Sequence, residues 1–249
     1  MDDIIALNKF FISAEHHPDL YNFVEVKLEL NYKTEISTHL PTQKIHLGII
    51  PDGNRRWCKQ HGMTFFDFTK MVQHMILSMF YNIVSRKVPP IFNMVDEVSI
   101  YVLSKDNLKR DDDTLHLIEE VMDLFCAMLK VDEFASQVVF DVHGEILLLP
   151  DSLQSKIQTC IQLSKGSFPI HLAIGYDPLL DSELCLKHPR RQIDMVVRSG
   201  GQLRSSGFYP LQTLYSEWVY YDTLWPDMTL SIMSDALMKF LARQRNFGK

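Results

Sequence analysis

The sequence predicts an α/β fold with a mainly parallel central sheet flanked by helices. Three observations predict it. Short apolar runs of strand length alternate along the chain with longer stripes at helical spacing. Most of the runs end in turn-forming residues, and the segments rich in glycine, arginine and serine follow strands. In such sheets ligands bind at the carboxyl ends of the strands, so function is expected there.

Residues 1–44 are predicted to form an N-terminal extension to a main domain covering residues 45–249. Within the extension, Ile4 to Ile12 could form a short helix, and the alternating segment from Phe23 to Leu30 suggests a strand. The main domain begins with Ile45 to Ile50, a short apolar run that predicts a buried strand. Pro51-Asp52-Gly53-Asn54 then predicts a turn.

The remaining elements follow from the same patterns. A short helix is expected through Trp57 to His61, and a stripe from Phe68 to Val84 has helical spacing before Pro89-Pro90 ends it. Asp111 to Asp113 can cap a helix whose apolar face is Ile118, Val121, Met122, Phe125, Met128 and Leu129. The other predicted strands are 98–103, 138–142, 170–174 and 195–197, and the other predicted helices are 152–165 and 231–244.

Composition narrows the class of protein. The chain has 249 residues, 46% of them hydrophobic, which suits a globular domain with a sizeable core. The net charge of −6 argues against nucleic-acid binding through the overall field. No segment is apolar for long enough to span a bilayer, and no secretory signal is expected at the N-terminus. None of the four cysteines lies in a C-x-x-C pair, so reduced thiols in a cytoplasmic protein are expected.

The first candidate site is the turn after the first strand of the main domain. Asp52 offers a carboxylate suited to Mg²⁺, which often bridges protein carboxylates and substrate phosphates. Gly53 and Asn54 open a helix whose first N–H groups can bind phosphate, and Arg55 and Arg56 add cationic donors. Taken alone, such a turn is more often a surface turn with solvated arginines.

The second candidate site is the segment from Arg198 to Ser206. Its arginines, adjacent glycines and hydroxyls follow an apolar strand, a composition that can bind an anion through backbone N–H groups and guanidinium groups. A flexible polar loop is the alternative interpretation. Glu217, beside several aromatic residues, is either a polar group at a strand edge or a second metal ligand.

Four segments resemble signatures of the cis-prenyltransferase family, to which undecaprenyl diphosphate synthase belongs. His46 to Trp57 is similar to its H-x-A-x-I-M-D-G-N-x-R-W signature, and Arg198 to Phe208 to its R-T-G-G-E-x-R-x-S signature. Tyr215 to Met228 resembles the Y-A-E through L-W-P-D element, and Tyr101 to Leu108 resembles the weaker Y-x-x-S-x-E-N-W element. The segments occur in family order and span residues 45–248.

The resemblance implies a Mg²⁺-dependent enzyme that condenses isopentenyl diphosphate with an allylic prenyl diphosphate to make a Z-polyprenyl diphosphate. It implies an α/β sheet with a hydrophobic tunnel, usually in a dimer, with the product associating the enzyme peripherally with a membrane. Asp52 would hold Mg²⁺ and assist departure of the allylic diphosphate, Glu217 would complete the metal site, and Ser104 and Asn107 would lie near the condensing carbons. The residues expected to bind substrate are Gly53, Asn54, Arg55, Arg56, Trp57, Arg198, Arg204 and Ser206.

The chain also departs from the family pattern. Phe65 and Thr69 stand where the family usually has an arginine and a histidine near the allylic diphosphate, and Gln202 replaces an acidic residue. These changes leave two other interpretations open. One is an irregular head-to-middle coupling or terpene-forming enzyme on the same fold, and the other is a non-catalytic partner subunit of a heteromeric enzyme. Primer identity and product length do not follow from the sequence.

Overall fold

A computed structural model of the chain describes residues 43–64, 68, 84, 90–109, 112–130 and 132–243. The predicted extension over residues 1–44 therefore lies almost wholly outside the described residues, as do Phe65 and Thr69. The predicted helix from Phe68 to Val84 is described only at its two ends, and both of these residues are helical and buried.

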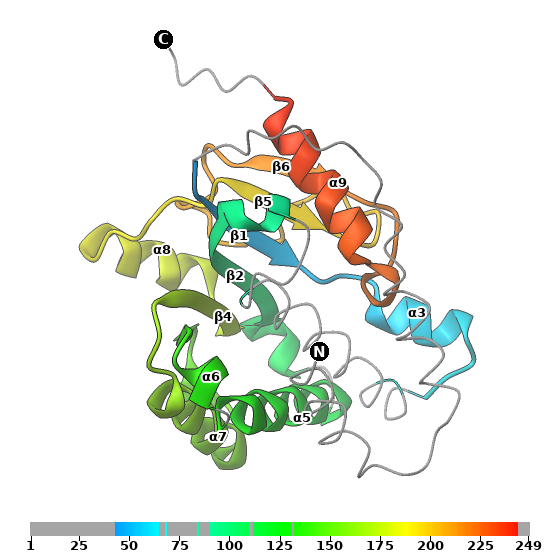
Figure 1. Ribbon diagram of the computed structural model, residues 1–249. Coiled ribbons are helices and arrows are strands. Elements are labelled where there is room, and N and C mark those ends of the chain that lie inside the picture. The colour runs from blue at the N-terminus through cyan, green and yellow to red at the C-terminus, as the bar shows by residue number, and fades with distance from the viewer. Residues whose placement is uncertain are drawn as a thin grey trace. The chain divides into compact units, whose positions relative to one another are not determined.

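The described residues contain one sheet of six parallel strands in the order β3-β4-β2-β1-β5-β6. This confirms the predicted α/β fold with its parallel sheet. The strands are β1 (Ile45–Ile50), β2 (Val95–Ser104), β3 (Val138–His143), β4 (Phe168–Tyr176), β5 (Met195–Arg198) and β6 (Glu217–Tyr220). Figure 1 shows the strands side by side with helices around them.

The α-helices of the described residues are α3 (Asn54–Gln60), α5 (Asp112–Leu129), α6 (Asp132–Ala135), α7 (Asp151–Leu163), α8 (Pro178–Lys187) and α9 (Leu230–Leu241). Short 3₁₀ turns join them: η1 (Pro90–Met94), η2 (Lys105–Lys109), η3 (Ile146–Leu148) and η4 (Trp225–Asp227). Helices α5 and α7 pack against each other (Figure 1), and α9 packs against β6 and η1. None of the described helices has the length and apolarity needed to cross a membrane.

The strand alternation gives the sheet two different faces. On one face, Ile100 and Val102 of β2 point toward an apolar cavity beneath α5. On the other face, Ile50 of β1 packs with Phe208 and Tyr209, which belong to the segment between β5 and β6. Successive side chains along a strand therefore lie in different environments, one at the cavity and the next in the core on the other face.

The helix α5 has the apolar face that its spacing predicts. Ile118, Met122 and Phe125 are almost fully buried, and Val121 is half-buried at the wall of the cavity. Helix α8 was not predicted. It begins where the Asp177 carboxylate accepts hydrogen bonds from the N–H groups of Leu179 and Leu180, and Pro178 occupies its first turn.

Candidate functional site at the carboxyl ends of the strands

The turn after β1 is placed by its parallel neighbour, β5. Ile50 lies opposite Arg198 in the register of these strands. The two predicted motifs are far apart in the sequence, but they therefore meet at the carboxyl ends of β1 and β5. The hydroxyl of Ser199 joins them by donating to the Asp52 carbonyl (2.8 Å) and accepting from the Asp52 N–H (2.9 Å). Ser199 lies inside the second motif, but its residue type and position did not predict this contact.

Asp52 lies between two arginines. Its Oδ2 atom is 2.8 Å from Nη2 of Arg198, and its Oδ1 atom is 3.3 Å from Nη2 of Arg56. The Arg56 side chain also donates to the carbonyl of Gly200 at 2.8 Å. About 29% of the Asp52 side chain is exposed, so its carboxylate can contact a ligand as well as these arginines.

Arg198 is the buried centre of this arrangement, with only 3% of its side chain exposed. Its Nη1 atom donates to the Ser206 hydroxyl at 2.8 Å and to the Arg204 carbonyl, while Nη2 holds Asp52. Its Nε atom is buried with no hydrogen-bond partner among the described residues. The fork of one guanidinium group thus fixes the loop after β5 against the turn after β1.

Two glycines allow these segments to approach. Gly53 has φ +110°, and a Cβ atom there would lie 2.8 Å from the Leu224 side chain. Gly200 has φ +83°, and a Cβ atom there would lie 2.6 Å from Nη2 of Arg56 and 3.0 Å from the Asp52 carbonyl oxygen. Any other residue would be strained at both positions and would displace the groups around Asp52.

A cavity of about 430 Å³ opens beside the carboxyl ends of the strands. Its polar end is formed by the turn after β1, and its walls are mostly apolar. The polar lining residues are Asp52, Asn54, Arg55, Arg56, Asn107 and Thr114. The apolar wall comes from β2, β4 and α5: Ile100, Val102, Leu103, Leu117, Ile118, Val121, Met122, Phe125, Leu172 and Ile174.

All five residues of the first candidate site line the cavity. Arg55 lines it and donates to the Thr114 hydroxyl at 2.7 Å. Asn107, carried by η2, also lines it, whereas Ser104 at the end of β2 is half-buried and is not part of its wall. Trp57 is 5% exposed and packs with Phe68 and His61, so its place is in the core behind the turn.

The structure places Glu217 away from Asp52 within the chain. Glu217 begins β6 and lies opposite Met195, the first residue of β5. Asp52 comes just after Ile50, which lies opposite Arg198, three residues farther along β5. Three residues of strand span roughly 10 Å. The Glu217 carboxylate instead accepts a hydrogen bond from Nη1 of Arg243 at 2.6 Å.

The loop after β5 carries the other residues that were predicted to bind substrate. Arg204 has an exposed side chain that donates to Gln202 at 2.9 Å, and its carbonyl is what contacts Arg198. Ser206 has φ +53°, and its carbonyl accepts from the Tyr101 hydroxyl at 3.1 Å. Arg198 and Ser206 therefore act together near Asp52, while Arg204 faces solvent.

Comparison with known proteins identifies the family to which the chain is related. A family model described as putative undecaprenyl diphosphate synthase matches residues 50–178 and 177–248. The chain belongs to this family. Its members are prenyltransferases, and the chain is an enzyme of that class.

Two relatives illustrate the similarity. The chain is 30% identical over 224 residues to the tritrans,polycis-undecaprenyl-diphosphate synthase (geranylgeranyl-diphosphate specific) of Aeropyrum pernix, covering 82% of this chain and 97% of the relative. It is 26% identical over 227 residues to an isoprenyl transferase of Rickettsia typhi, with the same two coverages.

Solved structures share the fold. Lavandulyl diphosphate synthase from Lavandula x intermedia, in complex with dimethylallyl diphosphate, matches with a TM-score of 0.63 and 22% identity, over 82% of this chain and 98% of that one. A probable undecaprenyl diphosphate synthase from Campylobacter jejuni matches with a TM-score of 0.60 and 21% identity, over 84% of this chain and all of that one.

Proposed function

We propose that this prenyltransferase joins isopentenyl diphosphate to an allylic prenyl diphosphate and forms a Z double bond at each addition. The observation that supports this most directly is that the cavity has a polar, charged end and apolar walls. A carboxylate and arginines form one end, and apolar side chains form the walls. An allylic diphosphate has the same division between an anionic head and a hydrocarbon chain.

The two arginine groups suggest how two diphosphates could be held. Arg55 and Arg56 line the cavity and can donate to the diphosphate of the allylic substrate. On the other side of Asp52, Arg198 and Ser206 support the loop that we propose binds isopentenyl diphosphate, with the exposed side chain of Arg204 available to its phosphates. This arrangement brings the two substrates to a common carboxylate.

A magnesium ion fits the oxygen donors at the polar end. Mg²⁺ is usually bound by one or two carboxylates together with substrate phosphates. The Asp52 carboxylate meets this requirement, and the Asn54 Oδ1 atom is buried nearby, with no hydrogen-bond partner in the part of the chain that the structure describes. Mg²⁺ would supply positive charge for the departing diphosphate. The role of Glu217 stays a prediction, because its carboxylate is engaged by Arg243.

The chemistry that we propose has three parts. The allylic C–O bond breaks and the diphosphate leaves with the electron pair, where Arg55 and Arg56 can stabilise its charge. The double bond of isopentenyl diphosphate attacks the allylic carbon, and a proton is then lost from the new chain. The walls from α5 and β4 would exclude water from the cationic carbon, and Asn107, which lines the same cavity, would lie near the condensing carbons.

We further propose a homodimer that works in the cytoplasm. Helix α8 exposes Leu179, Leu184 and Leu186, and the loop before β6 exposes Leu214 and Tyr215. Exposed apolar side chains in such number favour burial against a second subunit. All four cysteines are free and buried, which suits a reducing compartment. A long apolar product would bring the enzyme to a membrane surface.

The test of this function is product formation from defined substrates. Purified protein is incubated with Mg²⁺, labelled isopentenyl diphosphate and geranyl, farnesyl or geranylgeranyl diphosphate, and products are identified by mass spectrometry and NMR. We expect elongated chains with Z double bonds. Head-to-middle products would instead indicate irregular coupling, and absence of product with every primer would contradict catalysis by the chain alone.

The metal assignment is tested by a matched pair of variants. Asp52→Asn should abolish turnover, because the substitution removes the carboxylate at the polar end of the cavity. If Glu217 also holds the ion, Glu217→Gln should raise the Mg²⁺ concentration needed for turnover, and unchanged activity would show that it does not. An equal loss in both variants would show that Glu217 reaches the metal from a second subunit, because the strand register keeps it away from Asp52 within one chain.

A further inference from the structure

A group of histidines and carboxylates lies on the face of the sheet opposite the prenyl cavity. Asp141 and His143 are two residues apart on β3, so their side chains leave the same face of that strand. His171 of β4 lies directly opposite Asp141 in the parallel register. The register therefore brings the three side chains together, although the sequence separates His171 from the other two by about thirty residues.

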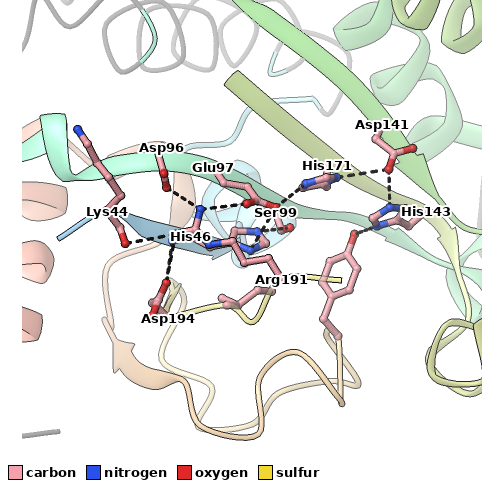
Figure 2. Close-up of polar contacts among 12 residues, drawn as sticks. Lys44, His46, Asp96, Glu97, Ser99, Asp141, His143, His171, Arg191 and Asp194 are labelled. Carbon is pink, nitrogen blue, oxygen red and sulfur yellow. Dashed lines mark hydrogen bonds and ion pairs between the residues drawn. The ribbon is translucent and has the colours of Figure 1, made fainter. Parts of the chain in front are cut away.

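The potential ligand atoms of these residues converge. Nε2 of His143 is 2.8 Å from Oδ2 of Asp141, and Nδ1 of His171 is 3.5 Å from the same oxygen. Figure 2 shows both imidazole rings directed toward the Asp141 carboxylate. One donor atom from each residue lies within 4.8 Å of the others, and donors around a tetrahedral Zn²⁺ ion are roughly 3.3 Å apart.

One of these atoms has no good partner in the described protein. The distance of 3.5 Å from His171 Nδ1 to Asp141 is too long for a strong hydrogen bond, and this nitrogen is buried with no other partner there. A buried ring nitrogen normally has a hydrogen-bond partner or a metal. A metal ion beside Asp141 would satisfy it.

The other nitrogen of each ring is already held. Nδ1 of His143 lies 2.7 Å from the Tyr209 hydroxyl, and Nε2 of His171 lies 2.8 Å from Oε1 of Glu97. Metal-binding histidines usually have the second ring nitrogen fixed in this way, because the outer hydrogen bond sets the tautomer and the ring orientation. Both rings are thus oriented with the remaining nitrogen toward Asp141 (Figure 2).

The cluster is also accessible from solvent. The side chain of Asp141 is 57% exposed, whereas those of His143 and His171 are 13% and 16% exposed. An ion can therefore enter past Asp141 and still be bound by two largely buried imidazoles. Two imidazoles with one carboxylate suit Zn²⁺ and similar transition metals, whereas Mg²⁺ prefers oxygen donors.

We propose that Asp141, His143 and His171 form a zinc-type metal site, with a fourth position left to water. The site is separate from the prenyl cavity, because its residues lie on the other face of the sheet. It would tie the edge strand β3 to β4. Through His143 it would also reach Tyr209, which lies in the core packed on that face.

The experiment uses the full chain, treated with EDTA and then dialysed. Zn²⁺ is titrated by calorimetry in excess Mg²⁺, so that oxygen-donor sites are filled, and Co²⁺ is used as a spectroscopic probe. We expect one Zn²⁺ per chain, a visible ligand-field band with Co²⁺, and a higher melting temperature with Zn²⁺. His143→Asn and His171→Asn should each weaken Zn²⁺ binding by at least roughly 100-fold.

Two further variants keep the test informative if the buried histidines cannot be replaced without unfolding. Asp141→Asn changes an exposed side chain and should also weaken Zn²⁺ binding. Tyr209→Phe removes only the hydroxyl that holds His143 and should weaken binding by about 10-fold. His116→Asn, on the surface of α5 beside Glu120, is the control and should change nothing.

Three outcomes would overturn the proposal. These are no stoichiometric Zn²⁺ binding by the wild-type chain, unchanged affinity in the folded Asp141 and Tyr209 variants, or an equal loss in the His116 control. The last result would indicate binding at surface histidines. The expected pattern, with loss in the cluster variants alone, would establish the site independently of prenyl transfer.

Discussion

Replacing Arg198 by lysine should reduce prenyl transfer strongly while leaving the protein folded. The positive charge is kept, but the fork of the guanidinium group is lost. Arg198 uses Nη2 to hold Asp52 and Nη1 to hold Ser206 and the Arg204 carbonyl. One ammonium group has a single nitrogen and cannot occupy both nitrogen positions.

The expected loss in kcat/KM can be worked out from these contacts. A lysine at position 198 can keep the contact with Asp52 or the contacts with the loop, so at least one hydrogen bond to a charged group is lost. Such a bond contributes about 1.5–3 kcal/mol. If the loss falls on the transition state, kcat/KM should drop roughly 10- to 100-fold. Arg198 is 3% exposed, so solvent screening does not weaken the effect.

The assay measures incorporation of labelled isopentenyl diphosphate, with kcat and KM determined for each substrate. Arg204→Lys is the matched control, because that side chain is exposed and pairs with Gln202. We expect the control to change KM for isopentenyl diphosphate and to leave kcat nearly unchanged. Circular dichroism and thermal melting show whether each variant is folded.

Wild-type kcat and KM in a folded Arg198→Lys protein would refute this reasoning, because the fork geometry would then be irrelevant to turnover. An equal loss of kcat in the Arg204 control would refute it in a different way. It would show that guanidinium contacts along the loop in general, and not the orientation of Asp52 by Arg198, limit the reaction.

Three other predictions follow from the described contacts. Gly200→Ala should lower activity by at least roughly 10-fold, since φ is +83° there and the new Cβ would lie 2.6 Å from Nη2 of Arg56; steady-state kinetics measures this. Val121→Phe should shorten the product, because it narrows the apolar wall of the cavity; mass spectrometry of the products shows the chain length. Burial lowers the pKa of His46 to about 4, although Glu97 opposes the shift, so the unfolded state takes up this proton first as pH falls. The free energy of unfolding should therefore fall by up to roughly 3 kcal/mol between pH 6.5 and 4, and denaturant melts in EDTA should show less acid sensitivity in His46→Gln.

The periodicity of the sequence predicted several elements closely. The apolar run from Ile45 to Ile50 forms β1 with the predicted bounds, and the predicted strand 170–174 lies inside β4. These strands are buried, so continuous apolar runs of strand length identify them. The apolar face of α5 was also readable from spacing, because one side of that helix is covered by the protein.

Elements with weaker patterns were missed or misplaced. Strand β6 has four residues, and its Glu217 and Trp218 do not form an apolar run. Helix α8 carries exposed leucines, so its spacing does not mark a buried side. Helix α3 begins at Asn54, before the predicted start, because Gly53 with φ +110° turns the chain directly into it.

Residue type and order were enough to identify which residues could carry the chemistry of the prenyl site. Asp52, the arginines after it and the segment from Arg198 to Ser206 were all chosen from residue type, order and resemblance. Their geometry, in contrast, depends on how distant strands pair. The register of β1 and β5 places Ile50 opposite Arg198, which makes Arg198 a buried partner of Asp52, and it leaves Glu217 at the level of Met195.

The cluster of Asp141, His143 and His171 shows even more clearly that strand pairing brings distant residues together. The sequence contains no ligand spacing that would connect His171 with the other two residues. Their proximity comes from the pairing of β3 with β4, which sets Asp141 opposite His171. Local pattern records which side of a strand a residue faces, whereas strand pairing decides which distant residues share that side, because the pairing depends on contacts throughout the sheet.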